Sequence, residues 1–432
     1  MHRTSSEELF ARYRQHPYIS TDSRIAQPGS LFFALKGDNF NGNQYSRNAL
    51  ENGAAYAVID DPAFCLDSRT LLVDDVLASL QQLASDFRST LRIPVIGITG
   101  TNGKTTTKEL MAAALSARFI THATTGNLNN HIGVPITLLT IKPETEIAVI
   151  EMGANHIGEI AALCRIARPT HGIITNIGKA HLEGFGSAEG VIKAKSELYH
   201  HLRHHGGTVF VNADNALLMS LTGNMERVTY GGDKNARFRG MVNHDGPLLR
   251  FTLSTPVDQT VSTKLAGSYN FENAMAALCI AQHFRVDLTA AVKAVENYEP
   301  KMNRSQVIRT EKNTLIMDAY NANPSSMQAA ILNFSRMKAD HKILLLGDMF
   351  ELGTEAPAEH LNILETAIAQ NFEAIITAGP CFNEAAAGKP GVISFDSVGE
   401  LKEHLAVHKI TGATILVKGS RGMKLESATD NL

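Results

Sequence analysis

The segment from Gly97 to Leu110, GITGTNGKTTTKEL, constrains the fold most, because it joins a buried-strand pattern to a helix through a glycine-rich turn. Residues 93–99 (IPVIGIT) are an apolar, β-branched run typical of a buried parallel strand, and residues 104–117 have apolar side chains at helical spacing. Glycines let the backbone adopt positive φ and approach a ligand closely, so the amides of the turn and the helix N-terminus can hold phosphate oxygens. The segment therefore predicts a phosphate-binding loop, with Lys104 on the terminal phosphates and Thr105 on Mg²⁺.

The match to the common pattern G-x-x-x-x-G-K-[ST] is inexact. The first glycine of that pattern would fall at Ile98, whereas the glycines of this chain are Gly97, Gly100 and Gly103. The alternative is a glycine-rich turn without a ligand. Because Gly-Lys-Thr directly follows an apolar strand, the sequence favours a nucleotide site.

Length and composition limit the class of protein. A chain of 432 residues suggests two to four domains, and 44% hydrophobic residues suffice for several cores. The net charge of −3, from 40 basic and 43 acidic residues, gives no overall attraction for nucleic acid or acidic membranes. The four cysteines are far apart and lack C-x-x-C spacing, so we expect ordinary buried thiols rather than disulfides or a zinc site.

The chain carries no recognisable targeting or membrane segment. Its N-terminus, MHRTSSEELFARYRQHP, has charges throughout, and nowhere do 18 apolar residues run together. We expect a cytoplasmic protein without membrane insertion. His200, His201, His204 and His205 lie in one polar stretch, which is more typical of a solvated helix end than of a metal cluster.

The order of predicted elements indicates an α/β protein with three domains. Residues 1–90 predict a small α/β domain, with strands at 31–35 and 54–59 and a helix at 46–52. In its segment 20–45, polar turns that include Ser23 and Arg24 flank a buried strand, and an ordinary loop and a binding role are equally open.

Residues 91–306 alternate strands and helices, which predicts a doubly wound, mostly parallel sheet with ligands at the carboxyl ends of its strands. Residues 225–265 switch to shorter strand-like segments and predict an antiparallel flank. Residues 267–284 predict an alanine-rich helix, at whose start Asn270 and Asn273 could cap the helix or reach a ligand.

Two further side chains stand where strands of this domain end. Glu151 closes an otherwise apolar strand at 146–152, and His181 follows the next strand, in IITNIGKAH. A carboxylate and an imidazole beside a phosphate loop can bind Mg²⁺ or orient a reacting group. The alternative is a buried pair that satisfies its own hydrogen bonds.

Residues 307–432 repeat the strand-turn-helix pattern and predict a second, Rossmann-like α/β domain. Polar side chains follow three of its strands. We expect them to gather at one edge that faces the central domain, and they are Asp318, Tyr320, Asn321 and Asn323, then Asp348 and Glu351, then Lys418, Ser420 and Arg421.

These motifs together resemble the Mur ligase family, the ATP-dependent amide-forming enzymes of peptidoglycan synthesis, which also includes folylpolyglutamate synthase. The resemblance covers essentially the whole chain. It rests on TGTNGKTTT, the Glu151 strand end, NIGKAHLEGFGS, AKSELY, SYNFENAMAA, Arg304 and DAYNANP. Within the family, TTGNLNNHIGVP, IEMGANHIGEI, DAYNANPSSM and LLGDMFELG are similar to the member that adds D-alanyl-D-alanine to UDP-N-acetylmuramoyl-tripeptide, and the D-N-P-R motif of the preceding ligase is absent.

The resemblance implies a role for each matching residue. ATP phosphates would be bound by Thr99, Gly100, Thr101, Asn102, Gly103, Lys104, Thr105 and Thr106, and the rest of ATP by Asn270, Asn273, Arg304 and Asp318. A second Mg²⁺ would be bound by Glu151, His181 and Lys195, the last as the carbamylated lysine of the family. The uridine nucleotide would be bound by Ser23 and Arg24, the peptide arm by Asn127, Asn129 and Asn130, and the incoming dipeptide by Tyr320, Asn321, Asn323 and Asp348.

Lys104, Lys195, His181 and Arg304 would be the catalytic set, and we expect a monomer. The sequence alone, without the resemblance, predicts that Lys195 is an exposed lysine on a helix. The chain departs from the family pattern at Tyr269, where a histidine is common, and at Asn303, where a glycine is common.

The resemblance implies that ATP phosphorylates the tripeptide's terminal carboxylate and that the dipeptide amine attacks the acyl phosphate. Three alternatives stay open at this stage. They are a ligase for another amino acid or peptide, a kinase or regulatory ATPase, and a catalytically silent nucleotide-binding module.

Overall fold

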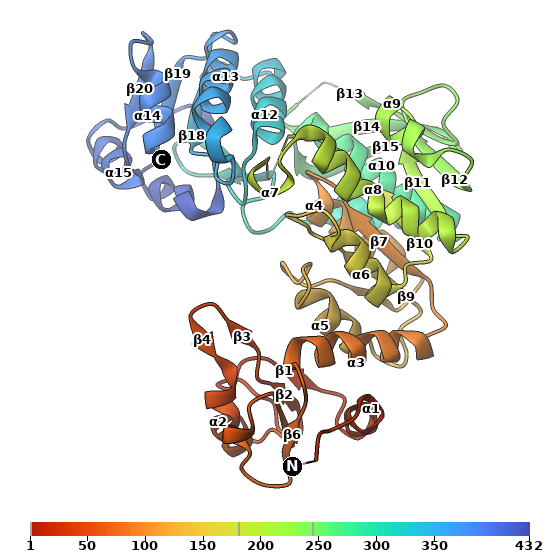
Figure 1. Ribbon diagram of the computed structural model, residues 1–432. Helices are drawn as coiled ribbons and strands as arrows, with labels where there is room; N and C mark the ends of the chain where they lie inside the picture. The colour runs from red at the N-terminus through yellow and green to blue at the C-terminus, as the bar shows by residue number, and fades with distance from the viewer. Residues whose placement is uncertain (1, 180–181, 244–245) are drawn as a thin grey trace.

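The computed structural model describes residues 2–179, 182–243 and 246–432. Three mixed or parallel sheets follow one another along the chain, with four, nine and six strands. Figure 1 shows the first sheet and its helices as a separate lobe below the central sheet, and the third sheet as a second lobe beside it. The α/β class predicted from the alternating pattern is confirmed.

The N-terminal lobe is built on a parallel four-stranded sheet in the order β1-β2-β5-β6. Its strands are β1 (Ile19–Ser20), β2 (Leu31–Phe33), β5 (Tyr56–Ile59) and β6 (Thr70–Leu72), with a hairpin of β3 (Lys36–Gly37) and β4 (Phe40–Asn41) and helices α1 (Ser6–Gln15), α2 (Ser46–Glu51) and α3 (Val76–Thr90). The hydroxyl of Tyr13 donates a hydrogen bond of 2.6 Å to the carbonyl of Leu139 and ties this lobe to the next one.

The central sheet has the order β15-β14-β13-β12-β11-β10-β7-β9-β8. Its strands are β7 (Val95–Thr99), β8 (Thr121–Ala123), β9 (Ile147–Glu151), β10 (His171–Ile174), β11 (Thr208–Asn212), β12 (Arg227–Gly231), β13 (Phe238–Asn243), β14 (Leu248–Thr255) and β15 (Gln259–Ala266). The predicted antiparallel flank is smaller than expected, because β12 and β13 continue the parallel pairing and only the pairs β13–β14 and β14–β15 are antiparallel.

Two layers of helices cover this sheet. One layer contains α4 (Lys104–Leu115), α10 (Phe271–His283) and α11 (Leu288–Asn297), and the other contains α3, α5 (Gly133–Leu139), α6 (Glu159–Ala167) and α8 (Ala188–His204). The short helices α7 (Leu182–Phe185) and α9 (Ala216–Thr222) lie in the connections. Every residue of β7 and β9 is buried, as expected for parallel strands with helices on both faces.

The predicted helix 267–284 begins as a short 3₁₀ turn at Ser268–Asn270, and the α-helix proper starts at Phe271. Asn270 occupies the N-cap position, but neither the Asn270 nor the Asn273 side chain makes a capping hydrogen bond. Asn270 donates to the carbonyl of Ala266 at 2.7 Å, and Asn273 donates to the side-chain oxygen of Asn270 at 2.9 Å, so the capping interpretation is wrong.

The C-terminal lobe has a sheet in the order β16-β17-β21-β18-β19-β20, in which only β16 is antiparallel. Its elements are β16 (Gln306–Arg309), β17 (Thr314–Asp318), α12 (Pro324–Arg336), β18 (Lys342–Gly347), α13 (Ala356–Ile368), β19 (Ala374–Ala378), α14 (Pro380–Ala386), β20 (Val392–Phe395), α15 (Val398–Val407) and β21 (Thr414–Lys418). Helix α12 begins with a capping box, since Asn323 and Ser326 each bind the other's backbone amide.

The cysteines are free thiols, and the prediction of buried thiols holds for Cys164 and Cys279 but not for Cys65 and Cys381, which are partly exposed. In the described ranges, no helix is both long and apolar enough to cross a membrane.

Candidate functional site

The phosphate loop lies between β7 and α4 and is shaped by the end of the neighbouring strand β10. The amides of Thr101 and Asn102 donate to the backbone and side-chain oxygens of Asn176, both at 2.9 Å, and the Thr175 hydroxyl donates to the Asn102 carbonyl at 2.6 Å. Gly100 (φ 143°) and Gly103 (φ 77°) have left-handed backbones, and a Cβ at Gly100 would collide with the Thr175 hydroxyl. Glycine is therefore required at these turns.

Lys104 is the first residue of α4, and its ammonium turns back over the loop. Its Nζ donates to the carbonyls of Gly100 at 2.7 Å and Thr101 at 3.1 Å. Burial lowers the pKa of Lys104, nearby Glu151 opposes that effect, and Arg304 adds to it. A lysine held among loop carbonyls by hydrogen bonds can exchange them for phosphate oxygens at the same place.

Glu151 ends β9 beside the loop and is 1% exposed. Its Oε1 accepts hydrogen bonds from Thr105 Oγ1 at 3.2 Å and Asn129 Nδ2 at 2.8 Å, whereas its Oε2 is buried without a hydrogen-bond partner. The Lys108 ammonium is 4.0 Å from that oxygen. A buried carboxylate oxygen that lacks a partner, next to a threonine hydroxyl, fits the oxygen ligands that Mg²⁺ requires.

Lys195 is buried, with 2% exposure, and the interpretation as an exposed helix lysine is wrong. It lies on α8, where its Nζ donates to the Ala154 carbonyl at 3.2 Å and lies 5.1 Å from the centre of the Phe185 ring. Burial, together with the nearby ammonium of Lys104, lowers the pKa of Lys195 to about 7. A large fraction of this amine is therefore neutral, and hence nucleophilic, at physiological pH.

The phosphate loop, Lys104 and Glu151 open into one cavity of 930 Å³ between the central and C-terminal lobes, whereas the buried Lys195 does not line it. The loop and the third lobe touch directly there, because Asn323 Nδ2 donates to Asn102 Oδ1 at 2.8 Å. The predicted residues that line it are Thr101, Asn102, Gly103, Lys104, Thr105, Thr106, Asn127, Asn129, Asn130, Glu151, Asn270, Asn273, Arg304, Asp318, Tyr320, Asn321 and Asn323. The polar turns of two lobes thus meet at one site, as the strand-end pattern predicts for the turn after β17 and for Lys418, whereas Glu351, Ser420 and Arg421 do not line the cavity.

Arg304 enters the cavity from a turn with unusual backbone geometry. Met302, Asn303 and Ser305 have φ of 58°, 55° and 49°, in the left-handed region that non-glycine residues seldom adopt. Asparagine is one of the residues that tolerate it, which explains how Asn303 occupies a position where the family often has glycine. The turn presents the Arg304 guanidinium over the ring of Tyr320, 3.4 Å from its centre.

Asp318 ends β17 and binds two partners. Its Oδ2 accepts from the Lys418 ammonium at 2.6 Å, and its Oδ1 accepts from the Ser305 amide at 3.1 Å. Lys418 is itself 2% exposed at the end of β21. This ion pair links two neighbouring strand ends at the cavity wall.

Several predicted site residues lie elsewhere. Ser23 is buried in the N-terminal lobe, and the Arg24 side chain is 84% exposed there, paired with Asp22 at 2.6 Å. Neither of them lines the cavity, and Thr99 and Gly100 do not line it either. His181 lies outside the described residues.

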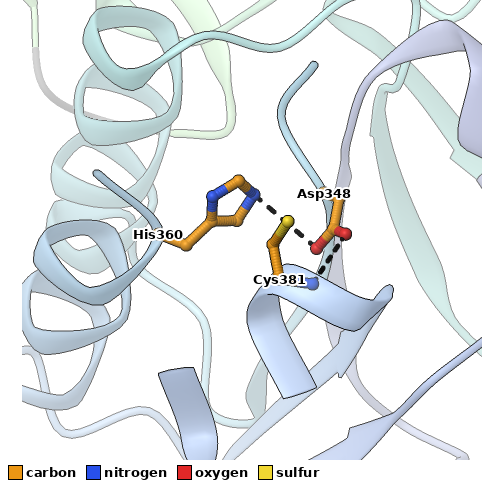
Figure 2. A group of neighbouring side chains, drawn as sticks. All are labelled: Asp348, His360 and Cys381. Atoms are coloured by element: carbon orange, nitrogen blue, oxygen red, sulfur yellow. Dashed lines mark hydrogen bonds and ion pairs between the residues drawn. The ribbon is translucent and has the colours of Figure 1, made fainter. Parts of the chain in front are cut away.

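Asp348 also does not line the cavity, since it is 1% exposed and turned inward. Its carboxylate accepts hydrogen bonds from the backbone amides of Cys381 at 3.0 Å and Phe382 at 2.9 Å, so it caps α14 (Figure 2). His360 lies beside this pair, but both of its ring nitrogens are engaged, with the Met349 amide at 2.9 Å and the Ala356 carbonyl at 2.6 Å. The cluster is a structural network rather than a metal site, and Asp348 is not placed to contact a ligand of the cavity.

Three residues that shape the site were not predicted from the sequence: Lys108, Thr175 and Asn176, of which Asn176 also lines the cavity. Lys108 is 2% exposed, and its ammonium donates to the Thr124 carbonyl at 2.7 Å. It stands four residues after Lys104, one helical turn along α4, and this spacing could have identified it. Asn176 and Thr175, which shape the loop, could have been found in the strand-end motif IITNIGKA.

The chain matches family models along most of its length. Residues 98–281 match the Mur ligase middle domain, residues 303–421 match the Mur ligase glutamate ligase domain, and residues 17–88 match the Mur ligase family catalytic domain.

Individual proteins align with nearly the whole chain. The UDP-N-acetylmuramoyl-tripeptide--D-alanyl-D-alanine ligases of Bacillus subtilis and Escherichia coli are 36% and 35% identical, over 96% and 94% of this chain and 92% of each relative. A crystal structure of MurF from Acinetobacter baumannii superposes with a TM-score of 0.87 at 32% identity, covering 96% of this chain and 93% of that one. With its phosphate loop, its two-lobed cavity and these likenesses, the chain belongs to the Mur ligase family.

Proposed function

We propose that this chain is the ATP-dependent ligase that adds D-alanyl-D-alanine to UDP-N-acetylmuramoyl-tripeptide and so forms the pentapeptide precursor of peptidoglycan. Relatives at 35% and 36% identity carry that activity in their names. The observation that carries the proposal is the hydrogen bond between Asn102 of the phosphate loop and Asn323 of the C-terminal lobe, at 2.8 Å inside one cavity. A nucleotide on the loop would therefore lie directly beside groups of the lobe that brings the second substrate.

The reaction needs an activated carboxylate, because a carboxylate is a poor acyl donor. The γ-phosphate of ATP passes to the terminal carboxylate of the tripeptide, and ADP leaves. The dipeptide amine then attacks the acyl carbon, the tetrahedral anion collapses, and phosphate leaves as the amide forms. Lys104 and Arg304 both line the cavity and would stabilise negative charge as the phosphoryl group moves, whereas Lys418, which also lines it, is paired with Asp318.

Binding of the three substrates divides among the lobes. Ser23 and Arg24 of the N-terminal lobe would hold the uridine nucleotide, and Asn127, Asn129 and Asn130 would face the peptide arm. The phosphate loop, Asn270, Asn273 and Asp318 would hold ATP. Tyr320, Asn321 and Asn323 remain the candidates for the dipeptide, and closure of the cavity would exclude water from the acyl phosphate.

Thr105 and Glu151 fit Mg²⁺, and we propose them as its ligands, with His181 as a further candidate. The bound ions would neutralise charge on the phosphates during transfer. We also propose that Lys195 is carbamylated, since its buried amine, with a pKa near 7, can add CO₂ and then present a carboxylate to the same site.

We further propose that the enzyme is a cytoplasmic monomer and that its product serves cell-wall growth, cell shape and division.

The direct test of the ligase activity uses purified protein with both substrates, ATP and Mg²⁺. ADP and phosphate should appear only when tripeptide and dipeptide are both present. A panel of acceptor amines separates this ligase from one with another specificity, and ATP consumption without dipeptide incorporation would refute the proposal.

A further inference from the structure

A second cavity lies at the N-terminal ends of the parallel strands of the central sheet, opposite the end that carries the phosphate loop. It has a volume of 740 Å³ and is formed by the C-terminal ends of α3, α6 and α8 and the residues just before β7 and β10. The five residues of β7 run from this end to the loop, a distance of about 16 Å at the usual rise per residue. The two cavities are therefore separate sites.

The lining of this cavity is strongly basic, and we call it the basic cavity. Its titratable side chains are Arg88, Arg92, Arg165, Arg168, His201 and His205, and no aspartate or glutamate lines it. In the described part of the chain, none of these arginines forms an ion pair with a carboxylate. The cavity thus has a surplus of positive charge within its own walls.

Arg88 forms the inner wall and is only 6% exposed. Its guanidinium donates to the carbonyls of Ala167 at 2.8 Å, Leu91 at 3.0 Å and Arg168 at 3.0 Å, so it closes the C-terminal end of α6. Burial and the neighbouring charge of Arg168 lower the pKa of Arg88. A buried cation beside another cation, with only neutral acceptors, is incompletely compensated.

Helix ends supply part of the missing negative charge. Each of the three helix C-termini carries about half of an elementary negative charge, roughly one and a half in total. Four arginines exceed that sum by more than two charges. His201 adds little charge at neutral pH, since burial and the adjacent His205 lower the pKa of His201 to about 4. Capping of helices alone therefore does not account for the arginines.

We propose that the basic cavity binds a phosphate-bearing anion, either a free oligophosphate or the phosphate headgroup of an anionic lipid. Guanidinium groups form paired, charge-assisted hydrogen bonds with phosphate oxygens. The side chains of Arg92, Arg165 and Arg168 are exposed at the cavity, and Arg168 also donates to the Ser85 hydroxyl at 3.0 Å. The volume lies within the range of small-molecule sites. The anion would supply the negative charge that the protein itself does not place there.

The test measures binding of inorganic tripolyphosphate by calorimetry at low ionic strength, in a Lys104→Ala background that weakens the phosphate loop. The key variant adds Arg165→Gln and Arg168→Gln, two exposed positions. A matched control adds Arg14→Gln and Lys312→Gln, exposed residues outside the cavity with the same change in net charge. Thermal unfolding verifies that each variant is folded.

We expect the key variant to bind tripolyphosphate at least about tenfold more weakly than the control. A parallel arm measures sedimentation with phosphatidylcholine vesicles, with and without phosphatidylglycerol. Arginine-dependent binding to the anionic vesicles assigns a lipid headgroup, and arginine-dependent binding of tripolyphosphate alone assigns a free phosphate compound. Equal binding by the key variant and the control in both arms, or no binding in either arm, would overturn the proposal.

Discussion

The guanidinium carbon of Arg304 lies 3.4 Å from the centre of the Tyr320 ring, and that of Arg421 lies 4.7 Å from it. One aromatic ring therefore contacts Arg304, which lines the cavity, and a second cation just after β21. The Nε of Arg304 is buried without a hydrogen-bond partner, so the ring contact is its main fixed interaction. Tyr320 thus positions Arg304.

Two replacements of Tyr320 should distinguish the contribution of its ring to catalysis from that of its hydroxyl. Tyr320→Phe keeps the cation–π contact and should leave kcat/KM for ATP within about threefold, because only the hydroxyl is lost. Tyr320→Ala removes a contact that contributes about 1–2 kcal/mol and should lower kcat/KM for ATP about tenfold or more. Steady-state kinetics with varied ATP measures this difference, and equal losses in both variants would show that the ring does not position Arg304.

Lys195 should be essential for catalysis in its carbamylated form. Lys195→Ala should abolish most activity, and a short-chain carboxylic acid should restore part of it by occupying the space of the carbamate. Full activity of Lys195→Ala would rule out this role. Lys402→Ala, on α15 of the C-terminal lobe, is a matched lysine control that should behave like the unaltered enzyme.

The same proposal predicts a dependence on pH. Protonation blocks addition of CO₂, and burial lowers the pKa of Lys195 to about 7. As pH falls through 7, the neutral amine and then the carbamate should be lost, so activity should decrease. Bicarbonate added at constant pH below 7 should recover it, whereas no response to bicarbonate in CO₂-depleted buffer would contradict carbamylation.

Glu151 should determine the requirement for Mg²⁺. Glu151→Gln preserves the shape of the side chain but removes the charge of the buried, unpartnered oxygen, so the Mg²⁺ concentration for half-maximal activity should rise at least about tenfold. Glu144→Gln changes an exposed carboxylate before β9 and serves as the control. Identical Mg²⁺ titrations for the two variants would show that Glu151 does not bind the metal.

The turn that carries Arg304 makes a prediction about stability. Asn303 has φ of 55°, which glycine adopts without strain and which a β-branched residue resists. Asn303→Gly should keep the unfolding temperature nearly unchanged, whereas Asn303→Val should destabilise the chain by about 1–2 kcal/mol. Thermal unfolding of the two variants tests this order, and a valine variant as stable as the glycine variant would show that the turn is not strained.

Local patterns in the sequence predict the fold class and the strand-end residues of the cavity, whereas Asn127, Asn129 and Asn130 are implied only by the family resemblance. Strand ends such as Asp318 and Glu151 follow apolar runs, and parallel strands bring their carboxyl ends to one edge of a sheet. The burial of Lys195 could not be predicted, because it depends on how α8 packs against Phe185 and the turn at Ala154. The prediction that Asp348 contacts the dipeptide is wrong for the same reason. A strand-end carboxylate can turn inward and cap a helix as easily as it can face a ligand.

The central claim is that the phosphate loop delivers a γ-phosphate to a carboxylate of the acceptor. The most direct test uses UDP-N-acetylmuramoyl-tripeptide labelled with ¹⁸O in its terminal carboxylate, with ATP, Mg²⁺ and D-alanyl-D-alanine. Acyl-phosphate chemistry predicts that the released phosphate carries one ¹⁸O atom for each amide bond formed. Unlabelled phosphate, released at the same rate without the dipeptide, would contradict the account.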